Sequence, residues 1–273
     1  MNLLTDDAAV SSPIHTMSAA TRTGDRLDWV AVEAPLEIRI GLKPATVLMR
    51  TPGDDEELVR GFLFSEGIIS RADEIVSLSR PPQLTGAQQG NVVAVELAVP
   101  RKARGLDRNF YSSSSCGVCG KKTIASLEVK GSAAAARWTV ARSILTTLPN
   151  QLRAAQPIFA KTGGVHASGL FTPDGQLVAV REDVGRHNAL DKLIGWALAS
   201  GKIPLADYLL VVSGRVSYEI IQKAIRASLP VIAAVGAPSS LALELAERFH
   251  LTLVGFLRHD SMNIYANPER VLE

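Results

Sequence analysis

Residues 207–256 read DYLLVVSGRVSYEIIQKAIRASLPVIAAVGAPSSLALELAERFHLTLVGF. Three apolar runs in this stretch predict strands, and the helical spacing between them predicts two helices. The strands are expected at 207–213, 230–235 and 251–256, and the helices at 217–228 and 239–250, with Ser239 or Ser240 as the N-cap of the second. Apolar strands that alternate with helices are typical of a largely parallel sheet covered on both faces. The predicted fold class is therefore α/β.

The region before this stretch predicts the start of the same sheet. Strands at 167–171 and 176–181 are joined by Thr172-Pro173-Asp174-Gly175, a strong signal for an antiparallel hairpin. A helix is expected at 186–200, and Gly201 ends it. Helical spacing also occurs at 149–160, where Pro157 interrupts it.

The N-terminal half has a different pattern. Strands are expected at 36–40, 44–50 and 92–99, and a helix that begins with acidic residues is expected at 54–65. Residues 1–24 are polar and lack a long apolar run, so we interpret them as a disordered tail. The chain then divides into this tail, a small α+β domain at 25–108, and an α/β domain at 109–273.

The composition excludes several classes of protein. The chain has 273 residues, 47% hydrophobic and 21% charged, with a net charge of +2, which fits a globular protein with an ample core. A small net charge and 5% aromatic residues disfavour a nucleic-acid partner. Neither a signal peptide nor an apolar run of membrane-spanning length is evident. A cytoplasmic location without membrane partners is therefore expected.

The two cysteines of the chain, Cys116 and Cys119, lie in the segment SSSSCGVCGKK at 112–122. Serine and glycine predict a flexible loop, and Lys121 and Lys122 favour a thiolate. Sulfur or redox chemistry is the favoured interpretation, and half of a zinc site or two inert buried thiols are the alternatives.

The spacing and surroundings of the two cysteines test zinc binding and dithiol redox chemistry. A structural zinc site needs four ligands, and a second cysteine pair is absent. A zinc deaminase needs His-x-Glu and a proline before its cysteine pair, and the sequence has neither. A thioredoxin-like pair opens a helix directly after a buried strand, whereas this pair follows a serine-rich loop. Sulfur chemistry remains the best fit.

Two glycine-containing turns, at 213–215 and 236–240, lie where predicted strands lead into helices. Ligands of open α/β sheets bind at this edge, and amides at a helix start bind phosphate. Arg215 adds a guanidinium suited to phosphate. A pyrophosphate-linked nucleotide fits two such turns, but glycine and serine also form ordinary turns, and both interpretations stay open.

Ionisable residues are concentrated between 181 and 187. They are Arg181, Glu182, Asp183, Arg186 and His187. A structural ion-pair network is slightly favoured over a catalytic cluster, because networks also concentrate charge. His187 and Asp191 have i, i+4 spacing and are expected to pair on one helix face. His166, between glycines, is a better candidate for function than for the core.

Taken together, these segments resemble the formate dehydrogenase accessory sulfurtransferases, the FdhD family. The resemblance extends from about Val30 to Tyr265. It depends on motifs that occur in the same order: TPGD at 51–54, SCGVCG at 115–120, GGVHA at 163–167, REDVGRHNA at 181–189 and SGR at 213–215. Several linked motifs are far more specific than any single one.

The resemblance implies a sulfur carrier that works with a cysteine desulfurase and formate dehydrogenase. Cys116 would carry a persulfide, and the role of Cys119 stays open. The sulfur would pass to the molybdenum (or tungsten) bis-molybdopterin guanine dinucleotide cofactor, which is a bound substrate, and no metal is expected to bind the protein directly. The implied cofactor-binding residues are Gly214, Arg215, Phe256, Leu257, Arg258, His259, Asp260 and Ser261.

The resemblance also implies a three-layer fold like that of cytidine deaminase, without zinc, and a homodimer. Two other functions stay open. One is a chaperone that binds and delivers the cofactor without sulfur chemistry, which the glycine turns and Arg258 favour. The other is dithiol redox chemistry at the cysteine pair.

Overall fold

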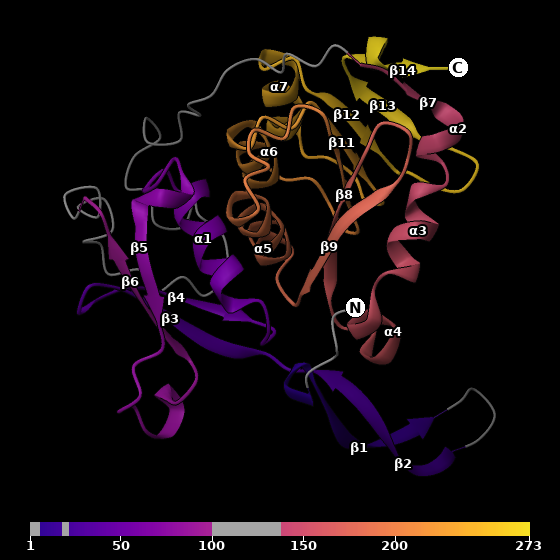
Figure 1. The fold of residues 1–273 in the computed structure, drawn as a ribbon. Coiled ribbons are helices and arrows are strands. Elements are labelled where there is room, and N and C mark those ends of the chain that lie inside the picture. Colours follow the sequence, from indigo (N-terminus) through magenta and orange to yellow (C-terminus); the bar gives the residue numbers. More distant parts are fainter. Residues whose placement is uncertain (1–5, 18–21, 100–137) are drawn as a thin grey trace.

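The computed structural model describes residues 6–17, 22–99 and 138–273. The cysteine loop lies outside these residues, as do Lys121, Lys122 and the predicted short periodicity at 124–129. The described chain has a mixed α/β fold with four sheets, which confirms the predicted fold class at this level (Figure 1). The finer likeness to cytidine deaminase stays a prediction.

The largest sheet has six strands in the order β13-β12-β11-β10-β8-β9. Its strands are β8 (His166–Phe171), β9 (Leu177–Asp183), β10 (Leu209–Val212), β11 (Val231–Ala234), β12 (Thr252–Gly255) and β13 (Asn263–Ala266). The β10–β11 and β11–β12 pairs are parallel, whereas the pairs β8–β9, β8–β10 and β12–β13 are antiparallel. The predicted largely parallel sheet is therefore wrong in extent, because antiparallel strands flank a parallel centre of three.

Helices cover both faces of this sheet (Figure 1). On one face lie α5 (Arg186–Ala199), α6 (Tyr218–Arg226) and α7 (Ser240–Arg248), and on the other lie α2 (Arg142–Leu145) and α3 (Leu148–Ala154). Along β10, Leu210 and Val212 belong to the hydrophobic core under α5, α6 and α7. Leu209 and Val211 belong to the core under α2 and α3. Because both faces of each central strand are covered, the strands have the continuous apolar runs seen in the sequence.

Several predicted boundaries agree closely with the structure. Ser239 is the N-cap of α7, and its hydroxyl accepts from the Ala242 amide. The helical segment around Pro157 is two helices, α3 and α4 (Pro157–Thr162), because proline cannot continue α3 but fits the first position of α4. Two strands after β12 were not predicted: β13, which pairs with β12, and β14 (Val271–Leu272), which pairs with β7 (Val140–Ala141).

The N-terminal part forms a second sheet in the order β4-β3-β6-β5. Its strands are β3 (Ala34–Ile40), β4 (Lys43–Arg50), β5 (Ile75–Ser79) and β6 (Val92–Leu97), and its helix is α1 (Asp55–Ser65). Strand β5 was not predicted. One hydrophobic core runs from this sheet through α1 to α5, α6 and α7, and the proposed domain boundary near residue 108 stays a prediction.

Helices α1 and α5 approach one another through glycine. A Cβ on Gly61 would lie 1.8 Å from the Asp191 carbonyl oxygen, and a Cβ on Gly195 would lie 1.8 Å from the Glu57 carbonyl oxygen. No larger residue fits at either position without moving a helix backbone. This contact fixes the N-terminal part against the large sheet.

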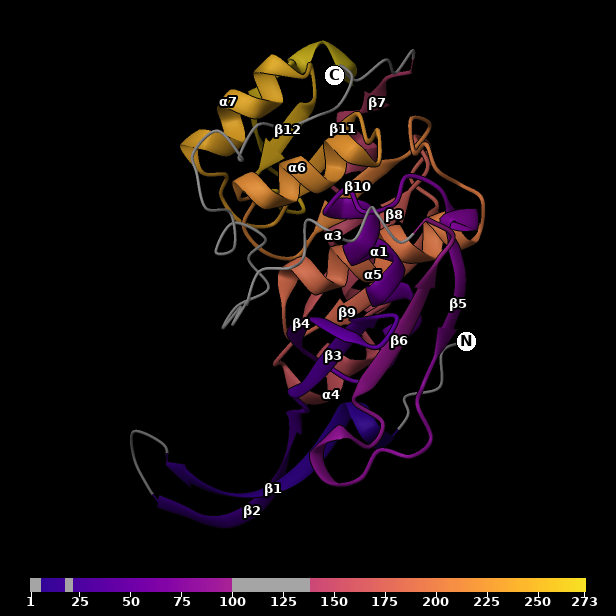
Figure 2. The same ribbon diagram turned by 90° about the vertical axis from the view of Figure 1, so that its left-hand side faces the viewer.

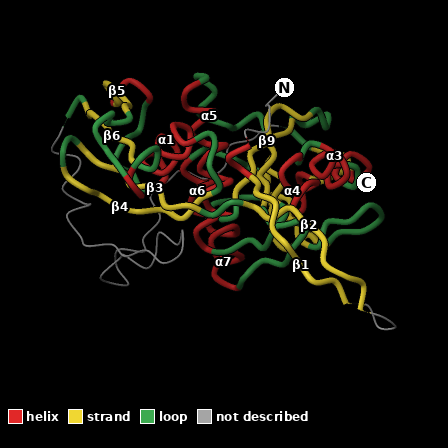
Figure 3. Tube along the Cα trace, turned by 90° about the horizontal axis from the view of Figure 1, so that it is seen from below, coloured by secondary structure: helices red, strands yellow, loops and turns green. Residues whose placement is uncertain are grey.

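The predicted disordered tail is wrong for the residues that the structure describes. Strands β1 (Ala9–Met17) and β2 (Arg22–Ala31) form an antiparallel hairpin that extends away from the rest of the chain (Figures 2 and 3). At its base the Lys161 ammonium of α4 lies 3.4 Å from the centre of the Trp29 ring. Pairing with the neighbouring strand, and the contact with Lys161, which is distant in sequence, order a segment whose composition is polar.

Two features are absent from the described residues. None of their helices has the length and apolar character needed to cross a bilayer. No group of three or more histidine, cysteine or acidic side chains in this part of the chain is placed to hold a metal ion.

Candidate functional site

Three turns meet where the parallel strands β10, β11 and β12 end, at residues 213–217, 235–240 and 255–261. We call them the glycine edge. The Gly236 amide donates to the Gly214 carbonyl at 3.1 Å, and the Phe256 amide donates to the Gly236 carbonyl at 3.1 Å. A Cβ on Gly236 would lie 2.7 Å from the Gly214 carbonyl oxygen, so glycine is required there for the backbones to touch.

Contacts within the glycine edge change the prediction that both turns have amides available for phosphate. The amides of Val216 and Ser239 are used between the turns, because they donate to Ala237 and Val216 carbonyls at 3.1 and 3.0 Å. Within the described chain, the amides of Gly214 and Arg215 have no backbone acceptor. The Arg215 side chain is exposed and forms no ion pair with another described residue. Only the first of the two predicted turns therefore combines free amides with an uncommitted cation.

The predicted cofactor-binding stretch 256–261 is the third turn of the edge. Phe256 is 42% exposed and has a left-handed φ of 51°, an unusual conformation for an aromatic residue. Leu257 is fully buried in the core, so its side chain cannot reach a ligand. The Arg258 guanidinium donates to the Val235 and Leu257 carbonyls at 2.7 and 3.0 Å and supports the turn. The remaining three residues, His259, Asp260 and Ser261, are exposed.

His166 lies beside the first turn of the glycine edge. A Cβ on Gly214 would lie 3.2 Å from its Nδ1 and 3.9 Å from Cδ of Arg186, so the small residue lets both side chains pack against the backbone. Burial, and then the positive charge of Arg186, lower the pKa of His166, while Asp183 opposes them. The sequence suggested His166 for function, and the structure brings it next to Gly214 and Arg186.

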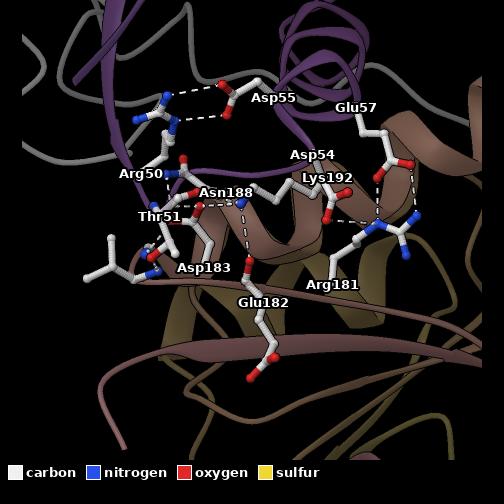
Figure 4. A network of polar contacts seen from close by, with 12 residues as sticks. Arg50, Thr51, Asp54, Asp55, Glu57, Arg181, Glu182, Asp183, Asn188 and Lys192 are labelled. Atoms are coloured by element: carbon white, nitrogen blue, oxygen red, sulfur yellow. Dashed lines mark hydrogen bonds and ion pairs between the residues drawn. The ribbon is translucent and has the colours of Figure 1, made fainter. Parts of the chain in front are cut away.

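The ionisable residues at 181–183 belong to a different, buried network (Figure 4). The Asp183 carboxylate is fully buried and accepts hydrogen bonds from the Thr51 and Gly185 amides at 3.1 and 2.8 Å. The Asn188 side chain donates to it at 2.9 Å, and Lys192 Nζ lies 2.9 Å from it. Burial raises the pKa of Asp183, and Lys192 opposes that shift.

The neighbours of Asp183 are also committed to structure. Arg181 donates to Glu57 of α1 at 2.8 Å, and Glu182 accepts from the Ile158 and Phe159 amides at the start of α4 at 2.9 and 2.8 Å. Burial raises the pKa of Glu182, and these two amides oppose the shift. Residues 181–183 therefore join β9 to α1, to α4 and to the Thr51 turn, which supports the structural interpretation of this run.

The expected pairing of His187 with Asp191 is replaced by two separate contacts. Asp191 binds Lys223 of α6 at 2.7 Å and accepts from Ser65 of α1 at 2.8 Å. The His187 ring faces Ser217 at 3.3 Å and Glu219 at 3.9 Å. The i, i+4 spacing holds along α5, and the contacts that the structure shows for Asp191 come from α6 and α1.

Sequence reasoning missed three buried cations. Arg50 is 2% exposed and donates to both oxygens of Asp55, at 2.8 and 3.0 Å. Lys192 and Lys223 are 1% and 4% exposed. Residues one turn away are themselves polar, such as Asn188 for Lys192 and Glu219 for Lys223, so no interrupted apolar face marks either lysine in the sequence. Cys116 and Cys119, which carry the predicted chemistry, lie outside the described residues, so their geometry stays a prediction.

The fold and the site define a mixed α/β protein that combines a buried network of ion pairs and hydrogen bonds with an exposed edge of touching glycine turns and arginine side chains. A family model described as FdhD/NarQ matches residues 31–272, and the chain belongs to the FdhD/NarQ family. This confirms the family that the sequence motifs suggested.

Named relatives cover most of the chain. The sulfur carrier protein FdhD of Mycobacterium bovis is 49% identical over 255 residues, which are 90% of this chain and 92% of the relative. The protein of the same name from Sulfurisphaera tokodaii is 44% identical over 248 residues, 90% of this chain and 92% of the relative. A crystal structure from Desulfotalea psychrophila, provisionally described as a formate dehydrogenase accessory protein, matches with a TM-score of 0.76 and 26% identity, over 97% of this chain and 100% of that one.

Proposed function

We propose that this protein is a sulfur carrier in the maturation of formate dehydrogenase, with Cys116 as the residue that carries the sulfur. The observation that carries the proposal is the sequence SCGVCG at 115–120, which holds both cysteines of the chain. Relatives about half identical to this chain are named sulfur carrier proteins. A carrier needs a nucleophilic thiol, and the chain offers these two alone.

Loading is a thiol exchange with a donor persulfide. The Cys116 thiolate attacks the outer sulfur of a persulfide on a cysteine desulfurase, the donor S–S bond breaks, and the donor cysteine leaves as a thiolate. Lys121 and Lys122, which follow the pair in sequence, favour the attacking thiolate. The product is a persulfide on Cys116, formed without any net change in oxidation state.

Release of the sulfur as sulfide requires two electrons, and Cys119 offers a balanced route. Its thiolate attacks Sγ of Cys116, the bond to the outer sulfur breaks, and hydrosulfide leaves with the electron pair. A Cys116–Cys119 disulfide remains, and a cellular dithiol must reduce it before the next cycle. This assigns unequal roles to the two cysteines.

The acceptor in this proposal is the molybdenum bis-molybdopterin guanine dinucleotide cofactor, bound as a substrate at the glycine edge. Its pyrophosphates suit free amides and guanidinium groups. The exposed Arg215, the free Gly214 and Arg215 amides and the exposed Phe256 ring support this location. We also propose that the carrier is a homodimer that contacts formate dehydrogenase, and that its large domain resembles cytidine deaminase.

The decisive experiment is a persulfide assay on single-cysteine variants. The protein is incubated without oxygen with a cysteine desulfurase and cysteine, and the peptide that contains Cys116 is weighed by mass spectrometry. Wild type and Cys119→Ser should each gain 32 Da, about the mass of one sulfur atom, and Cys116→Ser should not. Sulfur uptake at Cys119 in Cys116→Ser, together with normal activation of formate dehydrogenase, would show that Cys116 is not the carrier.

The alternative function is a chaperone that delivers the cofactor without sulfur chemistry. The exposed groups of the glycine edge favour binding, and they would serve a chaperone equally well. The two functions are separated by the variant that lacks both cysteines. A chaperone would still mature formate dehydrogenase, whereas a sulfur carrier would not.

A further inference from the structure

The hairpin of β1 and β2 is a two-stranded sheet that extends away from the rest of the described chain (Figures 2 and 3). A two-stranded hairpin is marginally stable in water, and further strands or a packed apolar face are needed to stabilise it. Helix α4 supports the base of the hairpin through the contact of Lys161 with Trp29. Farther from the base, the Leu27 side chain is 70% exposed. The outer part of the hairpin therefore has little cover from the described fold.

Both faces of the hairpin expose apolar side chains. The strand register places Val10 opposite Val30 on one face and Pro13 opposite Leu27 on the other. Val10 is 51% exposed and Val30 is 43% exposed, and Trp29, on the same face as Leu27, is 42% exposed. Apolar side chains gathered on a protruding element indicate a surface that binds another protein.

The two outer edges of the hairpin differ. Proline occurs in edge strands with its nitrogen toward solvent, so Pro13 removes a donor from the outer edge of β1. Strand β2 contains no proline, and its outer edge pairs with no strand of the described chain. Other outer strands are protected, since β4 contains Pro44 and β13 has only four residues. The ten residues of β2 therefore form an open edge that can accept another strand.

The charges of β2 are complementary to a second copy of the same strand. Arg26 and Asp28 lie on one face, and their side chains are 62% and 49% exposed. In an antiparallel pair with a two-fold axis at Leu27, Arg26 of each copy lies directly opposite Asp28 of the other. An axis at Arg26 or at Asp28 would instead place like charges opposite one another, which destabilises a strand pair. The charge pattern therefore favours the register centred on Leu27.

We propose that this protein forms a two-fold dimer in which the outer edges of β2 pair antiparallel about Leu27. The two hairpins then form one four-stranded sheet. The inference rests on the proposed function, because it assigns a surface to the homodimer of the carrier. Pairing satisfies the backbone groups along the open edge, brings Leu27 of the two copies together at the axis, and forms two Arg26–Asp28 pairs across it.

Sedimentation equilibrium of the full chain across a dilution series measures the dimer. Leu27→Asp removes the apolar contact and places two carboxylates at the axis, so it should raise the dissociation constant by more than about 100-fold. Leu42→Asp is the matched control, because Leu42 is 95% exposed between β3 and β4, outside the hairpin, and it should dimerise like wild type. Circular dichroism verifies that each variant keeps the fold.

Charge exchange distinguishes pairing across copies from the ion pair within one strand, where Arg26 and Asp28 are 3.5 Å apart. Arg26→Asp and Asp28→Arg each place like charges opposite one another twice, so each variant alone should dimerise about 10-fold more weakly. A mixture of the two variants should form a heterodimer with nearly the affinity of wild type. Opposite charges then meet across the axis, although each copy still has like charges within its own strand.

A disulfide test measures the register directly. In a chain whose native cysteines are replaced by serine, Leu27→Cys places two thiols opposite one another at the axis, and oxidised glutathione should link the copies. Asp28→Cys is the control, because position 28 points to the other face and lies opposite position 26 of the second copy. It should form no covalent dimer under the same conditions.

Three results would overturn the inference. Leu27→Asp could dimerise like wild type, the mixture of charge variants could dimerise no better than either variant alone, or wild type could remain monomeric throughout the dilution series. Persulfide formation on Cys116 is measured in the preparations that retain both cysteines. Normal sulfur loading with any of these results removes the β2 surface but leaves the sulfur carrier in place, whereas absent loading removes the carrier itself.

Discussion

Asp183 and Arg186 are three positions apart in one sequence motif, and they have opposite relations to the protein around them. Asp183 is fully buried, and amides, an amide side chain and Lys192 surround its carboxylate. Arg186 is half-buried and binds no other described residue. The motif at 181–189 is one charged cluster in the sequence, but it has two parts in the structure. Residues 181–183, the structural half, bind α1 and the Thr51 turn. Arg186 lies beside Gly214 of the glycine edge. The number of partners, rather than the density of charge, distinguishes the two.

The largest expected effect comes from breaking the structural half. Lys192→Met removes the cation from Asp183 and leaves a buried carboxylate, so the free energy of unfolding should fall by about 3–5 kcal/mol. Urea unfolding followed by circular dichroism measures it. Lys202→Met, a lysine near Tyr208 and outside the network, is the control and should change stability by less than about 1 kcal/mol. A similar loss in both variants would mean that the Asp183 network does not hold the fold.

The contact between α1 and α5 is the next feature to test. Gly61→Ala places a methyl group 1.8 Å from the Asp191 carbonyl oxygen, and the helices must separate. Overpacking of this kind destabilises by about 3 kcal/mol. Gly164→Ala is a milder control, because its nearest neighbour is the Ala31 methyl group at 3.2 Å. Equal thermal midpoints for Gly61→Ala and wild type would contradict the close approach of the two helices.

The next test compares Arg181, which binds Glu57, with Arg186, which binds no other described residue. Arg181→Gln breaks the pair with Glu57 and should lose about 1–3 kcal/mol of stability, since hydrogen bonds to a charged group are lost. Arg186→Gln removes no described contact and should change stability by less than about 0.5 kcal/mol. Urea unfolding of the two variants side by side measures both. If Arg186→Gln proves the more destabilising of the two, Arg186 belongs to the structural half.

The sequence was informative where the pattern is local. The apolar runs at 209–212, 231–234 and 252–255 identified the central strands, and serine identified the start of α7. The hairpin of β1 and β2 was missed although its strands are neighbours in sequence, because its residues are largely polar and its contact between Trp29 and Lys161 comes from the fold. Strand β13 was missed because its four residues become a strand by pairing with β12.

The site shows the same limit. Glycine at 214 and 236 suggested a binding edge, but the backbone contact that requires glycine there joins two turns distant in sequence. The i, i+4 rule placed His187 and Asp191 on one face and did not reveal that Lys223 of another helix would bind the acid. Charges that are buried by tertiary packing can be predicted as a cluster, whereas their partners come from the fold.

The smallest expected effect is the titration of His166. Its pKa lies below the ordinary value of 6.5 because of burial and the charge of Arg186. The unfolded chain therefore binds a proton at this residue before the folded chain does, and its contribution to stability is present above pH 6.5 and decreases as the pH falls from 6.5 to the folded pKa. NMR titration of the His166 ring in wild type and Arg186→Gln measures the folded value. Removal of the nearby cation should raise the pKa of His166 toward 6.5, although burial keeps it below that value. An identical His166 pKa in the two proteins would show that the guanidinium does not face the ring.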